Sequence, residues 1–100
     1  MPFKNYDDFL DKELKDPEVA AEYLNAALES GAMEEFLVAL RNVARSHGGP
    51  GELARMTRLN RQSLYKMLSE NGNPTLGSLM TLLKVMRIRL TFSPSQSKAA

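Results

Sequence analysis

The chain has 100 residues, the length of one domain, and 43% of them are hydrophobic, which is enough to form a core. It contains no cysteine and a single histidine, which excludes disulfides, thiolate metal sites and histidine clusters, so we expect no metal and no cofactor. No apolar run is long enough to cross a membrane, and the start of the chain is acidic where a signal peptide would be basic. We therefore expect a single-domain cytoplasmic protein.

Charge is divided unequally along the chain, although the net charge is only +1. Residues 1–36 carry ten acidic residues and three lysines, whereas residues 37–100 carry ten lysines or arginines and two acidic residues, Glu52 and Glu70. The basic part is suited to DNA, where Lys and Arg displace counterions from phosphates. The acidic part would be repelled by DNA, so it is either suited to a basic partner or simply the solvated face of surface helices.

The acidic part has the periodicity of three helices. Apolar side chains recur at helical spacing over residues 6–14, which predicts a short amphipathic helix. A second helix is predicted over 17–29, because Asp16 is a good N-cap and a proline follows at the first helical position. A third apolar stripe predicts a helix over 32–46, so the acidic N-terminal helices are expected within residues 1–47.

The middle of the chain, residues 51–68, has the spacing of a helix, a tight turn and a second helix. Asn60 is a good N-cap for the second helix, and Ala54 is small enough for the two helices to cross closely. The apolar anchors of this motif are Leu53, Ala54, Leu59, Leu64 and either Met67 or Leu68. This is the pattern of a helix-turn-helix, whose second helix lies in a DNA groove.

The outer face of the second helix is polar and carries Arg61, Gln62, Ser63 and Lys66. Glutamine can bond adenine in two places, arginine can do so to guanine, and hydroxyls and lysine serve bases or phosphates. These residue types indicate sequence-specific DNA binding. A polar face opposite a Leu/Ala face is also typical of any surface helix in an all-α domain, so the motif alone leaves both interpretations open.

The last part of the chain is predicted as a turn, a helix, a strand and a tail. A turn sequence over 69–74 precedes a helix over 76–86, for which Thr75 is the N-cap. Residues 87–92 alternate between polar and apolar side chains, which predicts a short strand. The small polar residues 93–100 are expected to be disordered.

The predicted strand has no other strand in the chain with which to pair. Because one strand is not stable alone, the simplest partner is the same strand of a second copy, across a two-fold axis. Such a homodimer would also place two DNA-reading helices about one DNA turn apart, as a palindromic operator requires. The expected architecture is an all-α domain over residues 1–92 with about five to six helices and a short C-terminal strand.

Three stretches carry a resemblance to a known family. They are LKDPEVAAEYLNAALESG over 14–31, LARMTRLNRQSLYKMLSENGNPTLGSL over 53–79 and LLKVMRIRLTF over 82–92. On these stretches nearly the whole chain resembles the λ-repressor-like (XRE-type) antitoxins, and among them the probable addiction module antidote group, which is similar to HigA-like proteins. The middle stretch is common to many repressors and indicates only DNA binding, whereas the first stretch is more specific to this group.

The resemblance implies a λ-repressor-like domain that acts as an antitoxin. Such a protein neutralises a small toxin of the RelE/HigB superfamily, which commonly cleaves mRNA, and it represses the operon that encodes both. Carried over residue by residue, the resemblance assigns DNA contacts to Asn60, Arg61, Gln62, Ser63 and Lys66, and contacts to the DNA backbone to Arg55, Arg58 and Tyr65. Because an RNA-cutting toxin is expected to be basic, the acidic helices are the candidate surface for it.

Two positions depart from the family pattern. Arg58 in the turn and Arg87 before the strand stand where the family usually has glycine. If these backbones are left-handed, each non-glycine residue costs roughly 1 kcal/mol; otherwise the turn geometry shifts. Arg58 could instead gain a contact to a phosphate.

Two other functions compete with the antitoxin hypothesis. An orphan or phage-type transcriptional regulator would use only the basic half and leave the acidic helices as plain surface. A small hydrolase would need a nucleophile with a base, or a metal site, and the chain offers one histidine, no cysteine and carboxylates scattered over helical faces. The sequence therefore predicts a DNA-binding antitoxin that is not an enzyme.

Overall fold

The computed structural model describes residues 6–95, which contain six α-helices. The first three are α1 (Tyr6–Glu13), α2 (Pro17–Glu29) and α3 (Met33–Ser46). The other three are α4 (Gly49–Thr57), α5 (Arg61–Met67) and α6 (Leu76–Val85). The predicted all-α class is confirmed. Among the helices, the largest difference is that α4 begins earlier than Leu53, just after a left-handed Gly48.

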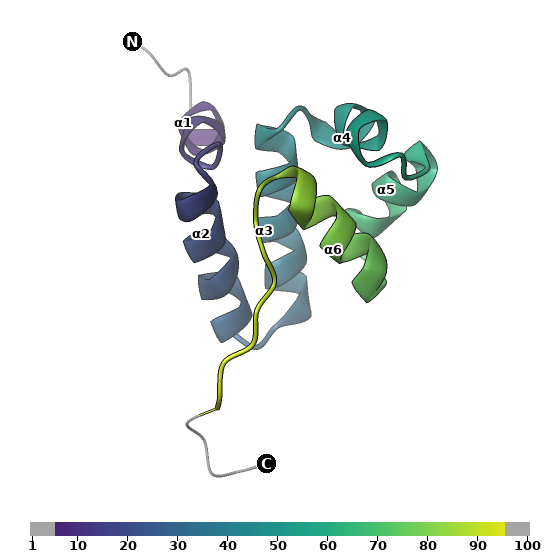
Figure 1. Ribbon diagram of the computed structural model, residues 1–100. Coiled ribbons are helices and arrows are strands. Elements are labelled where there is room, and N and C mark those ends of the chain that lie inside the picture. Colours follow the sequence, from purple (N-terminus) through teal and green to yellow (C-terminus); the bar gives the residue numbers. More distant parts are fainter. Residues whose placement is uncertain (1–5, 96–100) are drawn as a thin grey trace.

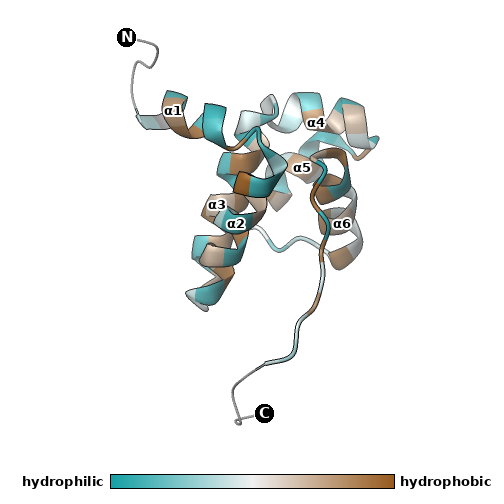
Figure 2. Ribbon diagram, turned by 60° about the vertical axis from the view of Figure 1, so that its left-hand side comes forward, coloured by the Kyte–Doolittle hydropathy of each residue, from teal (hydrophilic) through white to brown (hydrophobic). Residues whose placement is uncertain are grey.

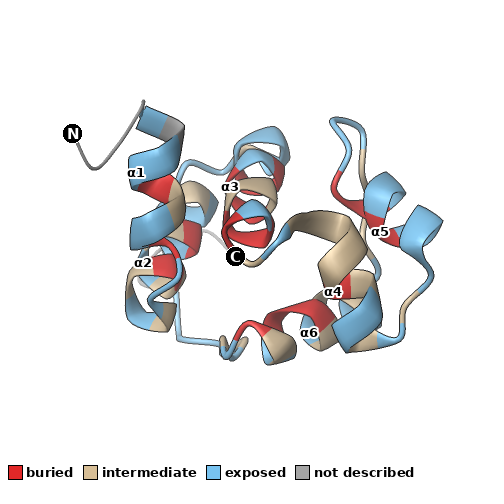
Figure 3. Ribbon diagram, turned by 90° about the horizontal axis from the view of Figure 1, so that it is seen from above, coloured by how far each residue is buried: buried red, intermediate tan, exposed pale blue. Residues whose placement is uncertain are grey.

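Helix α3 lies at the centre of the fold (Figure 1). It contacts α1, α2 and α4, and α4 in turn contacts α5 and α6. Seen from above, α1 and α2 lie on one side of α3, and α4, α5 and α6 lie on the other (Figure 3). We call α1 with α2 the acidic lobe, and α4 to α6 the basic lobe, after the charges of their sequences.

One hydrophobic core runs through both lobes. Buried apolar side chains come from every helix, and Figure 3 marks the buried positions along the ribbon in red. Full burial of one leucine-sized side chain contributes about 1.5–3 kcal/mol. The largest fully buried side chains are Leu14, Leu40, Val43, Leu53, Leu64, Leu82 and Met86. Because α3 contributes to this core on both sides, it holds the two lobes together.

The helices begin where the sequence places their caps. Asp16 Oδ1 accepts the backbone N–H of Glu18 at 2.9 Å at the start of α2. Thr75 Oγ1 accepts the backbone N–H of Ser78 at 3.1 Å at the start of α6. Figure 2 shows apolar positions recurring along each helix between polar ones. Capping and apolar periodicity therefore agree, and both predicted caps are confirmed.

Two polar contacts join the acidic lobe to α3. The Asn42 side-chain amide donates to the Tyr23 hydroxyl at 2.8 Å, and Arg45 Nε donates to Asp11 Oδ1 at 2.8 Å. The second contact is an ion pair near the surface, which is worth little by itself. Apolar packing of Leu10, Leu14, Ala20 and Leu24 in the shared core also holds the acidic lobe to α3.

The strand predicted over 87–92 does not form within this chain. No strand is present in the described residues 6–95, because a strand needs a hydrogen-bonded partner and this segment has none there. Arg87 turns the chain after α6 in a left-handed conformation, with φ 65°. The segment then runs back between α6 and α2 as extended chain (Figure 1). The predicted alternation is present in its burial, since Ile88 and Leu90 pack against the core while the residues between them are exposed.

Residues 1–5 and 96–100, which include most of the tail predicted to be disordered, lie outside the described residues. Residues 93–95 are exposed and have no regular structure. Within residues 6–95, no helix has the length and apolar character needed to cross a membrane.

Candidate DNA-binding surface

The turn between α4 and α5 is fixed by hydrogen bonds to its main chain. Thr57 Oγ1 donates to the carbonyl oxygen of Leu53 at 2.7 Å and accepts the backbone N–H of Leu59 at 3.1 Å. Between them, Arg58 ends α4 with φ 63°, and its N–H donates to the carbonyl oxygen of Ala54 at 3.0 Å. Arg58 therefore adopts the left-handed conformation that glycine favours, at a cost of roughly 1 kcal/mol.

Asn60 caps the start of α5, as predicted. Its Oδ1 accepts the backbone N–H of Gln62 at 2.8 Å and that of Ser63 at 3.2 Å. One side chain thus satisfies two of the amides that a helix leaves without partners in its first turn. This cap fixes Arg61 as the first residue of α5.

The apolar anchors predicted for the motif all face the core. Leu53 of α4 and Leu64 of α5 are completely buried, and Met67 and Leu68 at the end of α5 are buried with them. Ala54 and Leu59 are partly buried against the same core. Because one side of α5 is held by these contacts, the opposite side is fixed as the solvent face.

Every predicted site residue is exposed. The set comprises Arg55 on α4, Arg58 and Asn60 in the turn, and Arg61, Gln62, Ser63, Tyr65 and Lys66 on α5. The turn and α5 bring seven of these together along one short segment, and Arg55 lies on α4, which contacts α5. The structure therefore places seven of the predicted residues along one exposed, polar and mainly basic segment, with Arg55 on the neighbouring helix.

Arg61 already contacts other groups on this surface. Its guanidinium lies over the ring of Tyr65, 5.7 Å from the ring centroid. A Cβ on Gly51 would lie 3.5 Å from Arg61 Nη2, so the side chain also reaches back to the start of α4. A cation–π contact at an exposed site is worth about 0.5–1 kcal/mol. The four-residue spacing of Arg61 and Tyr65 on a helix is the sequence signal for this contact.

Arg55 is paired with an acidic residue of its own helix. Glu52 and Arg55 form an ion pair one turn apart, and Arg55 Nε also donates to Glu52 Oε2 at 3.3 Å. The hydrogen bond from Arg55 lowers the pKa of the Glu52 carboxyl and raises the pKa of Arg55, and the attraction between their charges acts in the same direction. Part of the positive charge of α4 is thus neutralised within the chain.

Arg41 of α3 anchors the end of α5. Its Nε donates to the carbonyl oxygen of Leu68 at 2.6 Å, and its side chain is partly buried. The last carbonyls of a helix have no partner within the helix, so this bond satisfies one of them. The sequence places Arg41 near the negative end of its own helix, and no local pattern shows that it reaches α5.

A hollow of about 450 Å³ with both polar and apolar lining residues lies beside α5. It is lined from α5 by Ser63 and Lys66, from the following loop by Asn71 and Asn73, and from α6 by Ser78. The sequence identifies this loop only as a turn. Two asparagines directly after a predicted DNA-reading helix are the signal that could have marked them as further polar groups of the surface.

Comparison with protein-family models assigns the chain to a family. Residues 4–94 match the family described as probable addiction module antidote protein. The chain belongs to this family. The antidotes of addiction modules are the antitoxins of toxin–antitoxin modules, so membership implies a toxin partner.

The comparison with curated proteins gives one relative to set beside this antidote. An uncharacterized protein of Haemophilus influenzae is 36% identical to it over 78 residues, which make up 78% of this chain and 77% of that protein. No solved structure matches the antidote chain. The family match covers both lobes, so the acidic helices are part of what defines an antidote of this family.

The acidic lobe of the antidote presents carboxylates to solvent. The exposed acidic residues of α1, α2 and the turn between them are Asp8, Glu13, Asp16, Glu18, Glu22 and Glu29. The polar surface on α5 lies on the other side of α3 (Figure 3). The antidote therefore has a negative and a positive surface separated by its central helix.

Proposed function

We propose that this antitoxin is a DNA-binding autorepressor of the XRE, or λ-repressor-like, type and is similar to HigA proteins. The observation that supports DNA binding is the geometry of α4 and α5. Hydrogen bonds of Thr57 before the turn and Asn60 after it fix the two helices. Leu53 and Leu64 anchor them in the core, and their polar face is open to solvent. The major groove of DNA admits a helix in this way.

The side chains of α5 divide into two roles in this proposal. Gln62 reads adenine through its amide, and Arg61 reads guanine after leaving the ring of Tyr65. The second role is contact with the DNA backbone, or with bases beside it. In this proposal it is taken by Arg55, Arg58, Ser63, Tyr65 and Lys66. Oδ1 of Asn60 is used by the helix cap, which leaves Nδ2 as its donor to DNA.

The toxin in this proposal is a small basic protein of the RelE/HigB type that binds the acidic lobe. The support is electrostatic, because the exposed carboxylates of α1 and α2 complement a surface that must bind RNA. The same charges keep this lobe away from DNA, so one molecule can hold both partners on opposite sides.

The DNA-binding form is a homodimer in this proposal, joined by the segment over 87–92. Two copies present two α5 helices to a palindromic operator.

The antitoxin acts by binding alone. Its single histidine, His47, lies at the end of α3 with its Nδ1 near Ser46 Oγ and the carbonyl oxygen of Val43, both at 3.1 Å, which is a structural position.

DNA binding is tested with duplexes from the region upstream of the protein's own gene and with scrambled duplexes, at several salt concentrations. Gln62→Ala should reduce discrimination between them by about 1–3 kcal/mol. Lys66→Ala should weaken binding to all duplexes alike and lower the salt slope by about one. Lys15→Ala, an exposed cation of the acidic lobe, is the control and should change neither. Equal losses from Gln62→Ala and Lys66→Ala on random DNA would contradict base reading.

Toxin binding is tested by co-purification of the native complex. Reversing Glu22 and Glu29 together to lysine should lose the toxin and keep operator binding, whereas Glu70→Lys in the basic lobe should keep the toxin. Retention of the toxin by the double variant would move its surface elsewhere. If no basic protein accompanies the native chain, the protein is an orphan regulator.

A further inference from the structure

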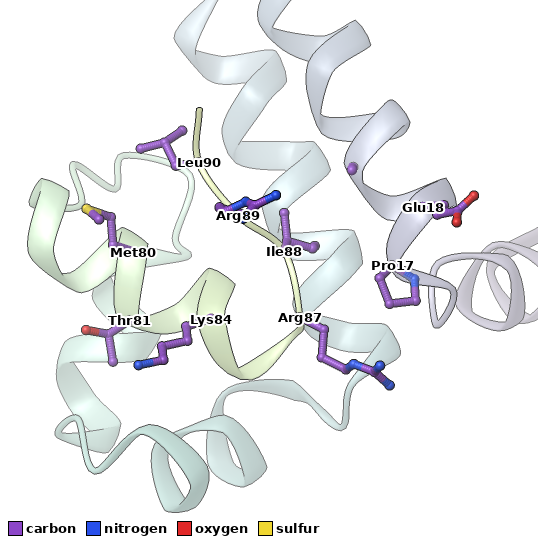
Figure 4. A pocket seen from close by; sticks show the side chains of 10 residues that line it. Pro17, Glu18, Met80, Thr81, Lys84, Arg87, Ile88, Arg89 and Leu90 are labelled. Atoms are coloured by element: carbon purple, nitrogen blue, oxygen red, sulfur yellow. The ribbon is translucent and has the colours of Figure 1, made fainter. Parts of the chain in front are cut away.

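An apolar groove of about 760 Å³ lies between α2, α6 and the segment that follows α6 (Figure 4). Its apolar lining comes from Pro17 and Ala21 of α2, Met80 of α6, and Ile88 and Leu90 of the segment. The charged residues Glu18, Lys84, Arg87 and Arg89 also line it. Figure 4 shows Leu90 beside Met80 on one side of the groove and Ile88 toward Pro17 on the other. The groove is therefore open along the segment that the sequence predicts to be a strand.

The backbone of this segment is available for pairing. The N–H of Ile88 donates to the carbonyl oxygen of Leu83 at 2.9 Å. Beyond it, residues 89–92 form no backbone hydrogen bond with another described residue. An extended segment with open N–H and C=O groups is a template for a second strand.

The apolar side chain next in the alternation is not covered. Phe92 has the same parity as Ile88 and Leu90, yet 91% of it is exposed. Leu76 and Met80 lie one turn apart on α6 and are 60% and 51% exposed. The segment runs down between α2 and α6 (Figure 1), and its Phe92 is left without apolar cover in this chain.

We infer that the groove is filled by a second copy of this chain, whose segment over 87–92 pairs antiparallel with the first, centred on Leu90, and whose Phe92 packs against Ile88. The inference deepens the homodimer of the proposed function and rests on it. Each copy supplies both a groove and the phenylalanine that fills the other groove. The contact is therefore self-complementary, as a two-fold interface requires.

Like-charge repulsion selects this register. A two-fold axis normal to the paired strands allows only registers centred on one residue. Centring on Ile88 sets Arg87 opposite Arg89 of the other copy, and centring on Arg89 sets the two Arg89 side chains opposite each other. Like charges directly opposite are destabilising. Centring on Leu90 sets Arg89 opposite Thr91 and removes both conflicts.

Apolar pairing distinguishes the remaining register. Centring on Leu90 makes three apolar cross-strand pairs, two of Ile88 with Phe92 and one of Leu90 with Leu90. Centring on Thr91 also separates the arginines, but it pairs only Leu90 with Phe92. It also sets Ile88 opposite Pro94, which has no N–H to donate. The register on Leu90 therefore buries all the apolar side chains of the segment.

Cysteine cross-linking tests the register directly, because the native chain has no cysteine. Directly opposite residues have Cα atoms about 4.5–5.5 Å apart, within the range for a disulfide, whereas diagonal neighbours are about 7–8 Å apart. Leu90→Cys should form a covalent dimer under mild oxidation. Arg89→Cys and Thr91→Cys should each fail alone, and the double variant of both should succeed. Because residues 89 and 91 are exposed, the double variant tests the register even if Leu90→Cys folds poorly.

The role of Phe92 is tested by sedimentation of the full chain. Phe92→Ala removes two buried phenylalanines from each dimer, one from each copy. If burying each ring contributes about 1.5 kcal/mol, the dissociation constant of the dimer should rise by about 100-fold. Tyr6→Ala, which removes another exposed aromatic ring on α1, should leave the dimer unchanged.

The remaining outcomes overturn the inference. A covalent dimer through Arg89→Cys or Thr91→Cys alone shows another register. A native chain that stays monomeric, with Phe92 protected only in the toxin complex, assigns the groove to the toxin. Cross-linking uses no DNA, so its failure with intact operator binding would overturn the pairing of the segment over 87–92 and leave the proposed DNA binding in place. If the cross-links form as expected for the Leu90 register but the chain does not bind the operator, only the proposed DNA-binding function is contradicted.

Discussion

The acidic and basic lobes share the core of α3 but are held to it by different contacts. In the acidic lobe, the polar contacts join side chain to side chain, as in the bond of Asn42 to Tyr23. On the other side, Arg41 of α3 donates to a main-chain group of the basic lobe, the carbonyl oxygen of Leu68 at the end of α5. Polar contacts of this second kind set the direction of a helix as well as its stability.

This difference matches what each surface has to do in the proposed function. Charge attraction to a basic partner tolerates small shifts of the carboxylates, because it acts over the Debye length of about 10 Å. Hydrogen bonds to base edges do not, since their donor–acceptor distances lie within about 2.7–3.2 Å. The basic lobe therefore needs a fixed helix angle, and the acidic lobe needs only an exposed set of charges.

The largest expected effect concerns the loop that closes the basic lobe. A Cβ on Gly72 would lie 2.1 Å from the carbonyl oxygen of Met67, which is backbone and has little room to move. Gly72→Ala should cost about 3 kcal/mol, the upper end for overpacking, in urea denaturation. It should also weaken operator binding, because the displaced loop carries Asn71 and Asn73.

Gly77→Ala is the matched control for this variant. Gly77 lies in the first turn of α6, is exposed and has no atom within 4 Å of an added Cβ. Alanine should stabilise the helix there by about 0.5–1 kcal/mol. If both variants lose the same stability, the close approach of the loop to α5 is not what Gly72 provides.

Loss of a cap separates the two lobes more sharply. Asn60→Ala and Asp16→Ala each remove a side chain that accepts a backbone N–H at the start of a helix, and each should cost about 1 kcal/mol in urea denaturation. Only Asn60→Ala should also weaken operator binding, because it frees the start of α5. Equal weakening of DNA binding by Asp16→Ala would show that the lobes are not independent in function.

Local signals were sufficient for most of the fold. The helices of residues 17–29 and 76–85, the caps at Asp16 and Asn60, and the buried anchors follow from spacing and side-chain chemistry within a few residues. The exposed face of α5 follows from the same periodicity, since its buried side is fixed by Leu64. These features need no knowledge of the rest of the chain.

Features that depend on distant residues could not be predicted in the same way. The hydrogen bond of Arg41 to Leu68 joins residues 27 positions apart. The Arg41 guanidinium and the Leu68 carbonyl oxygen each have many possible partners, so the sequence alone does not pair them. The segment over 87–92 has the alternation of a strand but not its hydrogen bonds, because no other described segment of the chain pairs with it. A sequence pattern indicates which side of an element is buried. It does not indicate which distant group that element contacts.

The left-handed arginines should give a smaller effect, of opposite sign to the cap variants. Arg58→Gly and Arg87→Gly relieve backbones with φ 63° and 65°, so each should raise thermal stability by roughly 1 kcal/mol or less. Arg58→Gly should also weaken binding to every duplex and lower the salt slope, since the proposal gives Arg58 a phosphate contact. Unchanged DNA binding after Arg58→Gly would contradict the proposed phosphate contact of Arg58.

The smallest expected effect lies in the exposed pair of Glu52 with Arg55. Its hydrogen bond holds the pKa of Glu52 below the usual value of 4.5, so the pair stabilises the fold above that pH and this contribution is lost as the pH falls through the lower, folded-state pKa. Stability measured at neutral pH should therefore fall slightly in Glu52→Gln, and the difference from the native protein should disappear in acid.

The same variant should act in the opposite direction on DNA. Glu52→Gln removes a negative charge from α4 and leaves Arg55 available to a phosphate, so affinity should rise and the salt slope should steepen by up to about 0.9. Glu70→Gln, which removes the other acidic residue of the basic half, controls for net charge alone. If both variants steepen the slope equally, Arg55 acts only through general charge. A larger change in Glu52→Gln would place Arg55 against the DNA backbone beside α5.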